Sequence, residues 1–201
     1  MPPAATCWGC RNLCGVTAAL LVMDVQVGIV GRIAEPEELL DRLATAVDAA
    51  RAAGVPVIFV RVAFREGYPE IAASNRTFSA LATSGAFDGS SPATQLHPRV
   101  APLATEVVVV KRRTSAFAGS DLAEVLRAGR IDTLVLTGIA TSGVVLSTLR
   151  QAADLDYGLV VLADACADAD PEVHRVLTTK VFTRQATVST VDEWVAGLKG
   201  A

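Results

Sequence analysis

The stretch Ala18-Ala19-Leu20-Leu21-Val22-Met23-Asp24-Val25 decides the fold of this chain. Every side chain in it is apolar except that of Asp24. A short, continuous apolar run without polar alternation predicts a strand that is buried on both faces. Strands of that kind belong to parallel sheets with helices on either side. The run therefore predicts an α/β fold and places an acid at the end of a buried strand.

Further apolar runs alternate with segments whose apolar residues recur at helical spacing. We expect strands at 55–60, 106–110, 131–137, 159–163 and 186–190, and helices at 36–53, 121–128, 142–153, 171–180 and 192–198. Ser120, Ser142 and Asp170 stand at the starts of predicted helices and are of residue types that cap helix N-termini. The alternation predicts a three-layer α/β/α domain with a six-stranded, mostly parallel sheet.

The segment 64–98 interrupts this alternation. It is rich in Gly, Ser, Thr, Asn and Pro and has no sustained period. Irregular segments of this length inside a compact domain commonly serve as a lid or a substrate loop. A long surface excursion with a short helix at about residues 76–81 is the alternative interpretation.

The composition is ordinary for one compact α/β domain. Of the 201 residues, 51% are hydrophobic and 19% charged, and the net charge is −3. We expect a flexible tail at 1–16 and a single domain at 17–201. Lys and Arg do not gather in one stretch, which argues against a nucleic-acid partner. The apolar runs are too short to cross a membrane and no secretory leader is evident, so a cytoplasmic location is expected by elimination.

The four cysteines fall into two groups. Cys7, Cys10 and Cys14 are spaced closely enough for their thiolates to bind a metal, but no second pair follows to complete a ligand set. Incidental thiols in a mobile extension are the favoured interpretation of this group. Cys166 follows a predicted strand far away, and we expect it to be a buried structural thiol.

Three segments with reactive groups stand at the carboxyl ends of predicted strands. They are Asp24, Lys111 and the turn Gly138-Ile139-Ala140-Thr141-Ser142-Gly143-Val144. Because the loops at the carboxyl ends of parallel strands form the binding crevice, we expect all three at one site. An acid beside a cation suits proton transfer with charge stabilisation, and a buried ion pair joining two strands is the alternative.

Other polar residues are candidate substrate contacts. Gln26 lies two residues after the acid, and Arg76 and Arg113 could bind an anionic group from flexible segments. A solvated surface charge is the alternative for Arg112 or Arg113. A nucleotide-binding fold is not indicated, because no G-x-G-x-x-G motif follows the first strand and no phosphate loop is present.

The runs ALLVMDVQVGIV, KRRTSAFAGSDL and VLTGIATSGVVLSTLRQAADLDYGLVVLADAC resemble the isochorismatase-like hydrolase superfamily. The resemblance covers roughly residues 17 to 195 in the right order. It implies an acid at Asp24, a lysine at Lys111, a cis peptide bond between Ile139 and Ala140, and association into homodimers or homotetramers. The nucleophilic cysteine of the amidohydrolase members falls on Val144.

Valine has no lone pair and no ionisable proton, so Val144 cannot attack a carbonyl. The resemblance therefore implies non-covalent chemistry by Asp24 and Lys111 on a small molecule with an amide, carboxylate or vinyl-ether group. Ala140, Ser142 and Gly143 would contact the substrate from the turn, and the backbone N–H groups of Gly143 and Val144 could polarise a substrate oxygen.

Two further possibilities remain from the sequence. Thr141, Ser142 and Ser147 are alternative nucleophiles, but none has an evident partner in His97 or His174. These two histidines also do not match the zinc ligands of nicotinamidases in the superfamily, so neither a metal nor another cofactor is expected. The competing function is that of a catalytically silent relative that binds a small ligand or scaffolds an oligomer.

Overall fold

The computed structural model describes residues 17–199 and contains six strands. The predicted tail at 1–16, with Cys7, Cys10 and Cys14, lies outside the described residues. The strands are β1 (Ala18–Met23), β2 (Val57–Val62), β3 (Val107–Lys111), β4 (Thr133–Ile139), β5 (Gly158–Ala167) and β6 (Thr187–Ser189). They form one sheet in the order β3-β2-β1-β4-β5-β6, and every neighbouring pair runs parallel.

The quoted stretch forms the centre of this sheet. β1 lies between β2 and β4, and Leu20, Leu21, Val22 and Met23 are completely buried. Alternate side chains of β1 enter two different apolar clusters on the two faces of the sheet. This burial on both faces explains why the strand carries no polar alternation.

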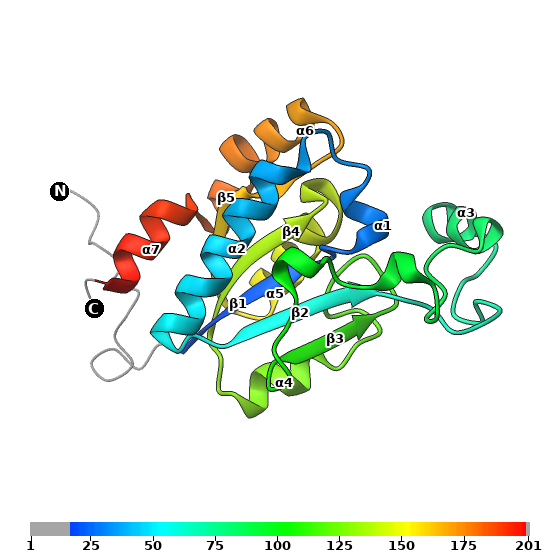
Figure 1. Cartoon of the computed structure of the whole chain (residues 1–201), viewed down its shortest axis with the longest axis horizontal. Helices are drawn as coiled ribbons and strands as arrows, with labels where there is room; N and C mark the ends of the chain where they lie inside the picture. Colours follow the sequence, from blue (N-terminus) through cyan, green and yellow to red (C-terminus); the bar gives the residue numbers. More distant parts are fainter. Residues whose placement is uncertain (1–16, 200–201) are drawn as a thin grey trace.

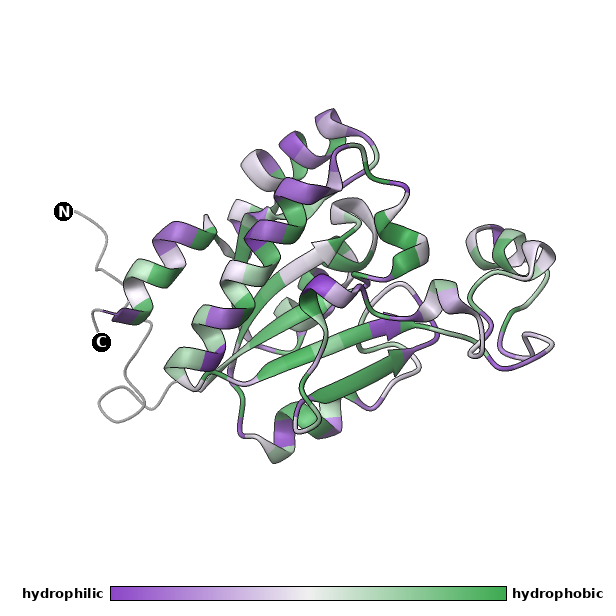
Figure 2. Ribbon diagram, in the orientation of Figure 1, coloured by the Kyte–Doolittle hydropathy of each residue, from purple (hydrophilic) through white to green (hydrophobic). Residues whose placement is uncertain are grey.

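Helices cover both faces of the sheet, so the three-layer α/β/α prediction is confirmed (Figure 1). The helices are α1 (Val27–Val30), α2 (Pro36–Ala53), α3 (Arg76–Ser84), α4 (Leu122–Ala128), α5 (Leu146–Asp154), α6 (Pro171–Val176) and α7 (Val191–Lys199). α2 and α7 pack on one face, and α4 and α5 pack on the other. Figure 2 shows the consequence in hydropathy, with apolar strands inside and polar residues along the helices.

Short helical turns complete the chain. They are the 3-10 turns η1 (Pro92–Thr94), η2 (Pro98–Val100) and η5 (Phe182–Arg184), and the π-helical turns η3 (Thr141–Val145) and η4 (Leu177–Val181). The predicted helix at 142–153 is thus η3 followed by α5, and the predicted helix at 171–180 is α6 followed by η4.

The irregular segment between β2 and β3 carries α3 and two of these turns. The short helix predicted at about 76–81 is confirmed as α3, which Figure 1 shows beyond one end of the sheet. The aromatic rings of Phe64, Phe78 and Phe87 form a separate small core that holds the segment together. An aromatic cluster can do this without any periodic pattern, because a few large rings bury much apolar area.

Of the three predicted helix caps, one is correct. Asp170 caps α6 by accepting hydrogen bonds from the backbone N–H groups of Glu172 and Val173. The N-cap of α4 is Asp121, although the Ser120 hydroxyl accepts a bond from the N–H of Leu122. The N-cap of η3 is Ala140, and Ser142 lies inside that turn, so the predicted capping role of Ser142 is wrong.

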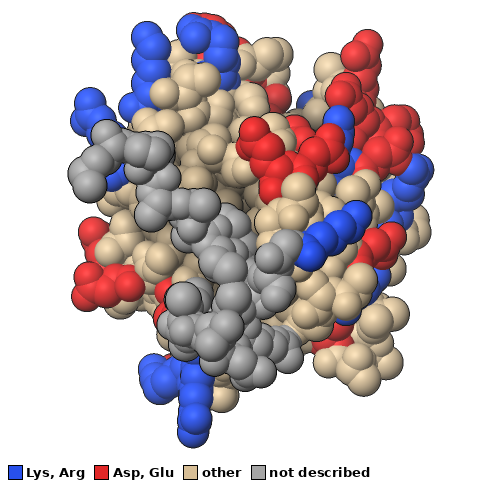
Figure 3. Space-filling model, turned by 90° about the vertical axis from the view of Figure 1, so that its left-hand side faces the viewer, with Lys and Arg blue, Asp and Glu red and all other residues tan. Residues whose placement is uncertain are grey.

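Two features of the described residues bear on the predictions about membranes and nucleic acids. Across residues 17–199, no helix combines the length and apolar character needed to span a bilayer. On the face that Figure 3 shows, acidic and basic side chains both occur, without one continuous basic stripe among the described residues.

Candidate active site

The site lies where the order of the strands reverses. From β1 the chain passes to β2 and β3 on one side, and it later returns to place β4 on the other side of β1. In open α/β sheets the crevice at the carboxyl ends of strands at such a switch point is the usual ligand site. Asp24 directly follows β1, and the Gly138–Val144 turn lies at the end of β4.

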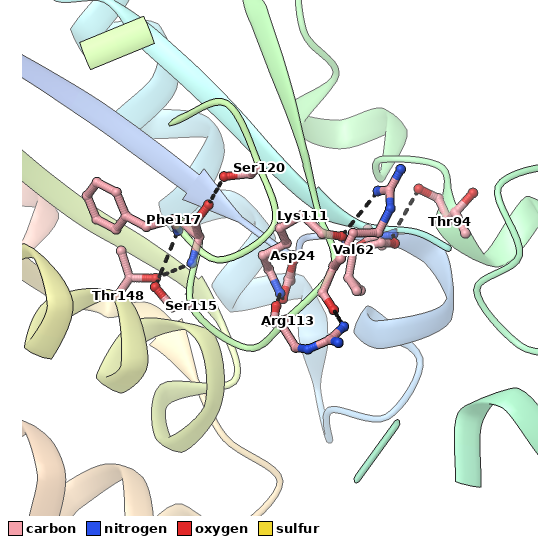
Figure 4. A network of polar contacts seen from close by, with 12 residues as sticks. Asp24, Val62, Thr94, Lys111, Arg113, Ser115, Phe117, Ser120 and Thr148 are labelled. Atoms are coloured by element: carbon pink, nitrogen blue, oxygen red, sulfur yellow. Dashed lines mark hydrogen bonds and ion pairs between the residues drawn. The ribbon is translucent and has the colours of Figure 1, made fainter. Parts of the chain in front are cut away.

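Asp24 and Lys111 form a buried ion pair at this crevice (Figure 4). Lys111 Nζ lies 2.9 Å from Asp24 Oδ2, and the two side chains are only 2% and 8% exposed. The same ammonium group donates a hydrogen bond of 2.9 Å to the carbonyl oxygen of Arg113. Lys111 therefore reaches from β3 past the end of β2 to the end of β1.

The second carboxylate oxygen of Asp24, Oδ1, differs from the rest of the ion pair in having no partner among the described residues. Oδ1 is buried and has no hydrogen-bond partner within residues 17–199. Burial raises the pKa of Asp24 above its ordinary value, and the charge and hydrogen bond of Lys111 oppose that shift. The backbone of Asp24 has a φ of 56°, in the left-handed region that non-glycine residues rarely adopt. A shifted carboxyl group on a strained backbone is typical of a functional site.

The turn after β4 passes unusually close to β1. Gly138 has a φ of +129°, and a Cβ atom on it would lie 2.0 Å from the carbonyl oxygen of Met23, so no other residue fits. The following peptide bond, between Ile139 and Ala140, is cis, as the resemblance implies. The close approach brings the turn beside Asp24 at the end of β1.

Contacts with α6 and its preceding loop hold this turn. The hydroxyl of Thr141 lies 2.8 Å from Nδ1 of His174, and the N–H of Ser142 donates a 2.7 Å hydrogen bond to Asp168 Oδ2. Burial lowers the pKa of His174, and the charge of Asp168 opposes the shift. The N–H of Gly143 donates to the carbonyl oxygen of Ala140 at 3.0 Å.

A cavity of about 290 Å³ opens over the ion pair. Its floor consists of Asp24, Lys111, Val62, Ile139, Gly143 and Val144. One wall comes from α1 and the loop after it, through Ile29, Arg32 and Ile33. A further part of the lining comes from the irregular segment, through Thr77, Phe78, Leu81 and Phe87. The guanidinium carbon of Arg32 stands 5.8 Å from the centroid of the Phe87 ring.

Comparison with known proteins assigns the family. The family model described as Isochorismatase domain matches residues 18–193. The chain belongs to the isochorismatase family. An uncharacterised isochorismatase family protein of Escherichia coli O157:H7, YecD, is 35% identical over 187 residues, which cover 88% of this chain and 94% of that protein. Family members are hydrolases, so this protein is an isochorismatase-family hydrolase.

Two further relatives show how broad the family is. The ureidoacrylate amidohydrolase RutB of Stutzerimonas stutzeri is 31% identical over 210 residues, covering 90% of this chain and 79% of that protein. An isochorismatase family protein from Burkholderia thailandensis has a similar structure, with a TM-score of 0.79, 28% identity, and coverage of 91% of this chain and 96% of the other. The family thus includes at least one named amidohydrolase.

The structure brings five of the sequence-predicted residues to this isochorismatase-family cavity. Asp24, Lys111, Ala140, Gly143 and Val144 all line it. Val144 is 2% exposed and stands in the floor, at the position that the resemblance gives to a cysteine. We predicted that the backbone N–H groups of Gly143 and Val144 could both polarise a substrate oxygen. The N–H of Gly143 is already bonded to the carbonyl oxygen of Ala140, which leaves the N–H of Val144 for this role.

Gln26 does not contact the cavity, contrary to our prediction. Its side chain is completely buried, with its amide nitrogen donating to the carbonyl oxygens of Val62 and Thr94 and its amide oxygen accepting from the N–H of Val62. These bonds occupy both ends of the amide group. Gln26 therefore ties the loop after β1 to β2 and η1.

Three other predicted contacts also lie off the cavity wall. Arg113 donates to the carbonyl oxygens of Glu70 and Arg112, and Arg76 is an exposed residue at the start of α3. The side chain of Ser142 is exposed, while its backbone bonds to Asp168. None of the three lines the cavity.

Two residues of the candidate site were not predicted from the sequence. Arg32 lies in a five-residue loop between α1 and α2, where no periodic pattern indicates which side chain faces the crevice. The sequence shows no evident partner for Thr141 in His174, but α6 lies beside η3 and brings the ring of His174 to Thr141. Predicting the contact between the Thr141 hydroxyl and His174 would have required knowing how α6 packs in the fold.

The remaining thiol and the metal donors can be placed as well. Cys166 is buried in the core, and burial raises its pKa to about 12, in agreement with its predicted structural role. Among residues 17–199, no group of three or more His, Cys, Asp or Glu side chains is arranged to hold a metal ion.

Proposed function

We propose that this hydrolase cleaves a vinyl-ether or C–N bond of a small molecule by non-covalent acid–base chemistry of Asp24 and Lys111, without a cysteine nucleophile. The observation that carries the proposal is the 2.9 Å ion pair in the cavity floor, beside a valine that has no nucleophilic atom. The pair supplies a proton donor and a compensating cation at one point, which is what acid–base hydrolysis requires.

The vinyl-ether reaction uses the neutral form of Asp24, which burial favours. The proton on Oδ1 moves to the terminal carbon of the C=C bond, and a lone pair of the ether oxygen forms an oxocarbenium ion. Lys111 then stabilises the Asp24 carboxylate. Water adds to the cation and returns a proton to Asp24, and the hemiketal breaks into a carbonyl compound and an alcohol that keeps the hydroxyl proton.

Cleavage of a C–N bond uses the ionised form of Asp24, which Lys111 favours. The carboxylate accepts a proton from water as the water oxygen attacks the carbonyl carbon. The C–N bond then breaks, and Asp24 passes the proton to the leaving nitrogen. The N–H of Val144 would stabilise the oxyanion in between. The amidohydrolase among the relatives supports this version.

The proposal assigns every proton transfer to residues of this chain, so we propose an enzyme that needs no metal or other cofactor. From the family we also infer a homodimer or homotetramer, which sedimentation of the full chain would test. The substrate is a small molecule, in keeping with the size of the cavity.

The experiment is to screen the full chain against amides, ureides and isochorismate and to compare it with Asp24→Asn. Asparagine keeps the size of the side chain but cannot donate or accept the reacting proton. Because a positioned acid or base contributes roughly 10²- to 10⁴-fold, we expect kcat to fall by at least about 100-fold. A fully active Asp24→Asn enzyme would remove the proposal.

One observation favours a second candidate function. Val144 places an aliphatic group in the cavity floor, which is what we would expect of a protein that has lost catalysis and retains ligand binding. If the protein turns over any compound in the screen and the Asp24→Asn variant does not, the non-catalytic function is excluded. Ligand binding without turnover across the whole panel would favour it.

A further inference from the structure

The cavity combines a largely apolar wall with a floor that carries the charged pair Asp24 and Lys111. Its wall is largely aliphatic and aromatic, with Ile29 and Ile33 from α1 and the loop after it, and Phe78, Leu81 and Phe87 from the irregular segment. Its volume of about 290 Å³ is at the lower end of the roughly 300–1,000 Å³ typical of pockets for drug-sized ligands. The walls therefore suit a compact ligand with an apolar body.

The two charged groups in the floor are poorly suited to bind a substrate anion. Lys111 is already paired with Asp24 and bonded to the carbonyl oxygen of Arg113. An anion placed there would also meet the carboxyl group of Asp24, and two carboxylates in one desolvated site repel each other. A negatively charged group of a ligand must therefore be held elsewhere in the cavity.

Arg32 is the cation that the wall offers for this purpose. Its side chain makes no ion pair or hydrogen bond with another group in residues 17–199. Its guanidinium group stands 5.8 Å from the centre of the Phe87 ring, within range of a cation–π contact. That contact orients the group and leaves its N–H donors for a planar, two-oxygen acceptor.

We propose that Arg32 binds the carboxylate of a substrate whose remaining body is small and apolar, and that Arg32 thereby determines specificity for monoanions. The carboxylate sits at the wall, the apolar body fills the space between Ile33 and Phe78, and the bond to be cleaved lies over Asp24. This inference rests on the proposed function only in placing the substrate in the same cavity.

The test is calorimetric binding of benzoate, benzamide and acetate to the full chain, which needs no turnover. Benzoate carries both the carboxylate and an apolar ring, benzamide is its neutral counterpart, and acetate has almost no apolar body. We expect benzoate to bind most tightly. Arg32→Gln should weaken benzoate binding by at least about 10-fold and leave benzamide unchanged, because a charge-assisted bidentate contact is lost. Arg32→Lys should fall between the two.

Arg184→Gln is the matched control, because Arg184 is an exposed arginine of η5 away from the cavity wall. Unchanged benzoate affinity in Arg32→Gln, an equal loss in Arg184→Gln, or no benzoate binding at millimolar concentration would overturn the inference. Asp24→Asn separates it from the proposed function. Full turnover in that variant would remove the acid–base proposal, while loss of benzoate affinity in Arg32→Gln would still support the role of Arg32.

Discussion

The hydroxyl of Thr141 lies 2.8 Å from Nδ1 of His174, which joins the turn after the central strand β4 to helix α6. Thr141 is completely buried, and its neighbours Ala140 and Gly143 line the cavity. His174 thus positions the turn and does not face the cavity itself.

The burial of His174 makes the stability of the protein depend on pH. Burial lowers the pKa of His174 below its ordinary value of 6.5, so the unfolded chain takes up a proton more readily than the folded one. The contribution of neutral His174 to stability is complete above the pKa that this residue has in the unfolded chain. It is lost as the pH falls through the lower pKa of His174 in the folded protein. We expect urea midpoints to fall from pH 7.5 to pH 5, and to fall less in His174→Gln. An identical pH dependence in the variant would contradict this assignment.

The Asp24–Lys111 pair should show strong energetic coupling. Lys111→Met leaves a buried carboxylate without its cation, which costs about 3–5 kcal/mol of unfolding free energy. Asp24→Asn with Lys111→Met removes both charges, so the double variant should be more stable than Lys111→Met alone. Urea denaturation of the two single variants and the double variant measures the coupling. Simple additivity of the two losses would mean that the groups do not interact.

Val144→Cys should introduce a reactive thiol into the cavity floor. The thiol would stand near the ammonium group of Lys111, which favours the thiolate. We expect alkylation by iodoacetamide at neutral pH and new hydrolysis of amides or ureides. Val145→Cys is the matched control, because Val145 is equally buried and does not line the cavity.

Both cysteine variants are made with Cys7, Cys10 and Cys14 replaced by serine, so that new labelling reports the introduced thiol. Cys166 remains in place, since burial raises its pKa to about 12 and keeps it unreactive. Equal reactivity at positions 144 and 145 would show that the cavity does not activate the thiol.

Gly138→Ala should destabilise the fold severely. The new methyl group would lie 2.0 Å from the carbonyl oxygen of Met23, on a backbone with a φ of +129°. We expect a loss of at least about 2 kcal/mol in unfolding free energy. Gly143→Ala serves as the comparison, because its added Cβ would meet no atom closer than 3.7 Å. Equal stability of the two variants in urea denaturation would contradict the predicted clash.

The sequence made some parts of the site predictable and others not. Asp24 and Lys111 end continuous apolar runs, so the edge of the sheet at which they meet follows from the strand pattern alone. Gln26 was misassigned because its sequence neighbours do not reveal that its amide is bonded at both ends to Val62 and Thr94. Arg32 was missed because a short loop carries no periodicity from which its direction could be inferred.

By itself, the sequence determined the α/β class, the parallel sheet and the ends of the strands that carry the acid and the lysine. Burial on both faces requires unbroken apolar runs, and such runs can be read from one segment at a time. Only the tertiary structure decided which loop residues face the cavity and which histidine meets Thr141. Those contacts join segments distant in the chain, and they depend on how helices and loops pack over the sheet.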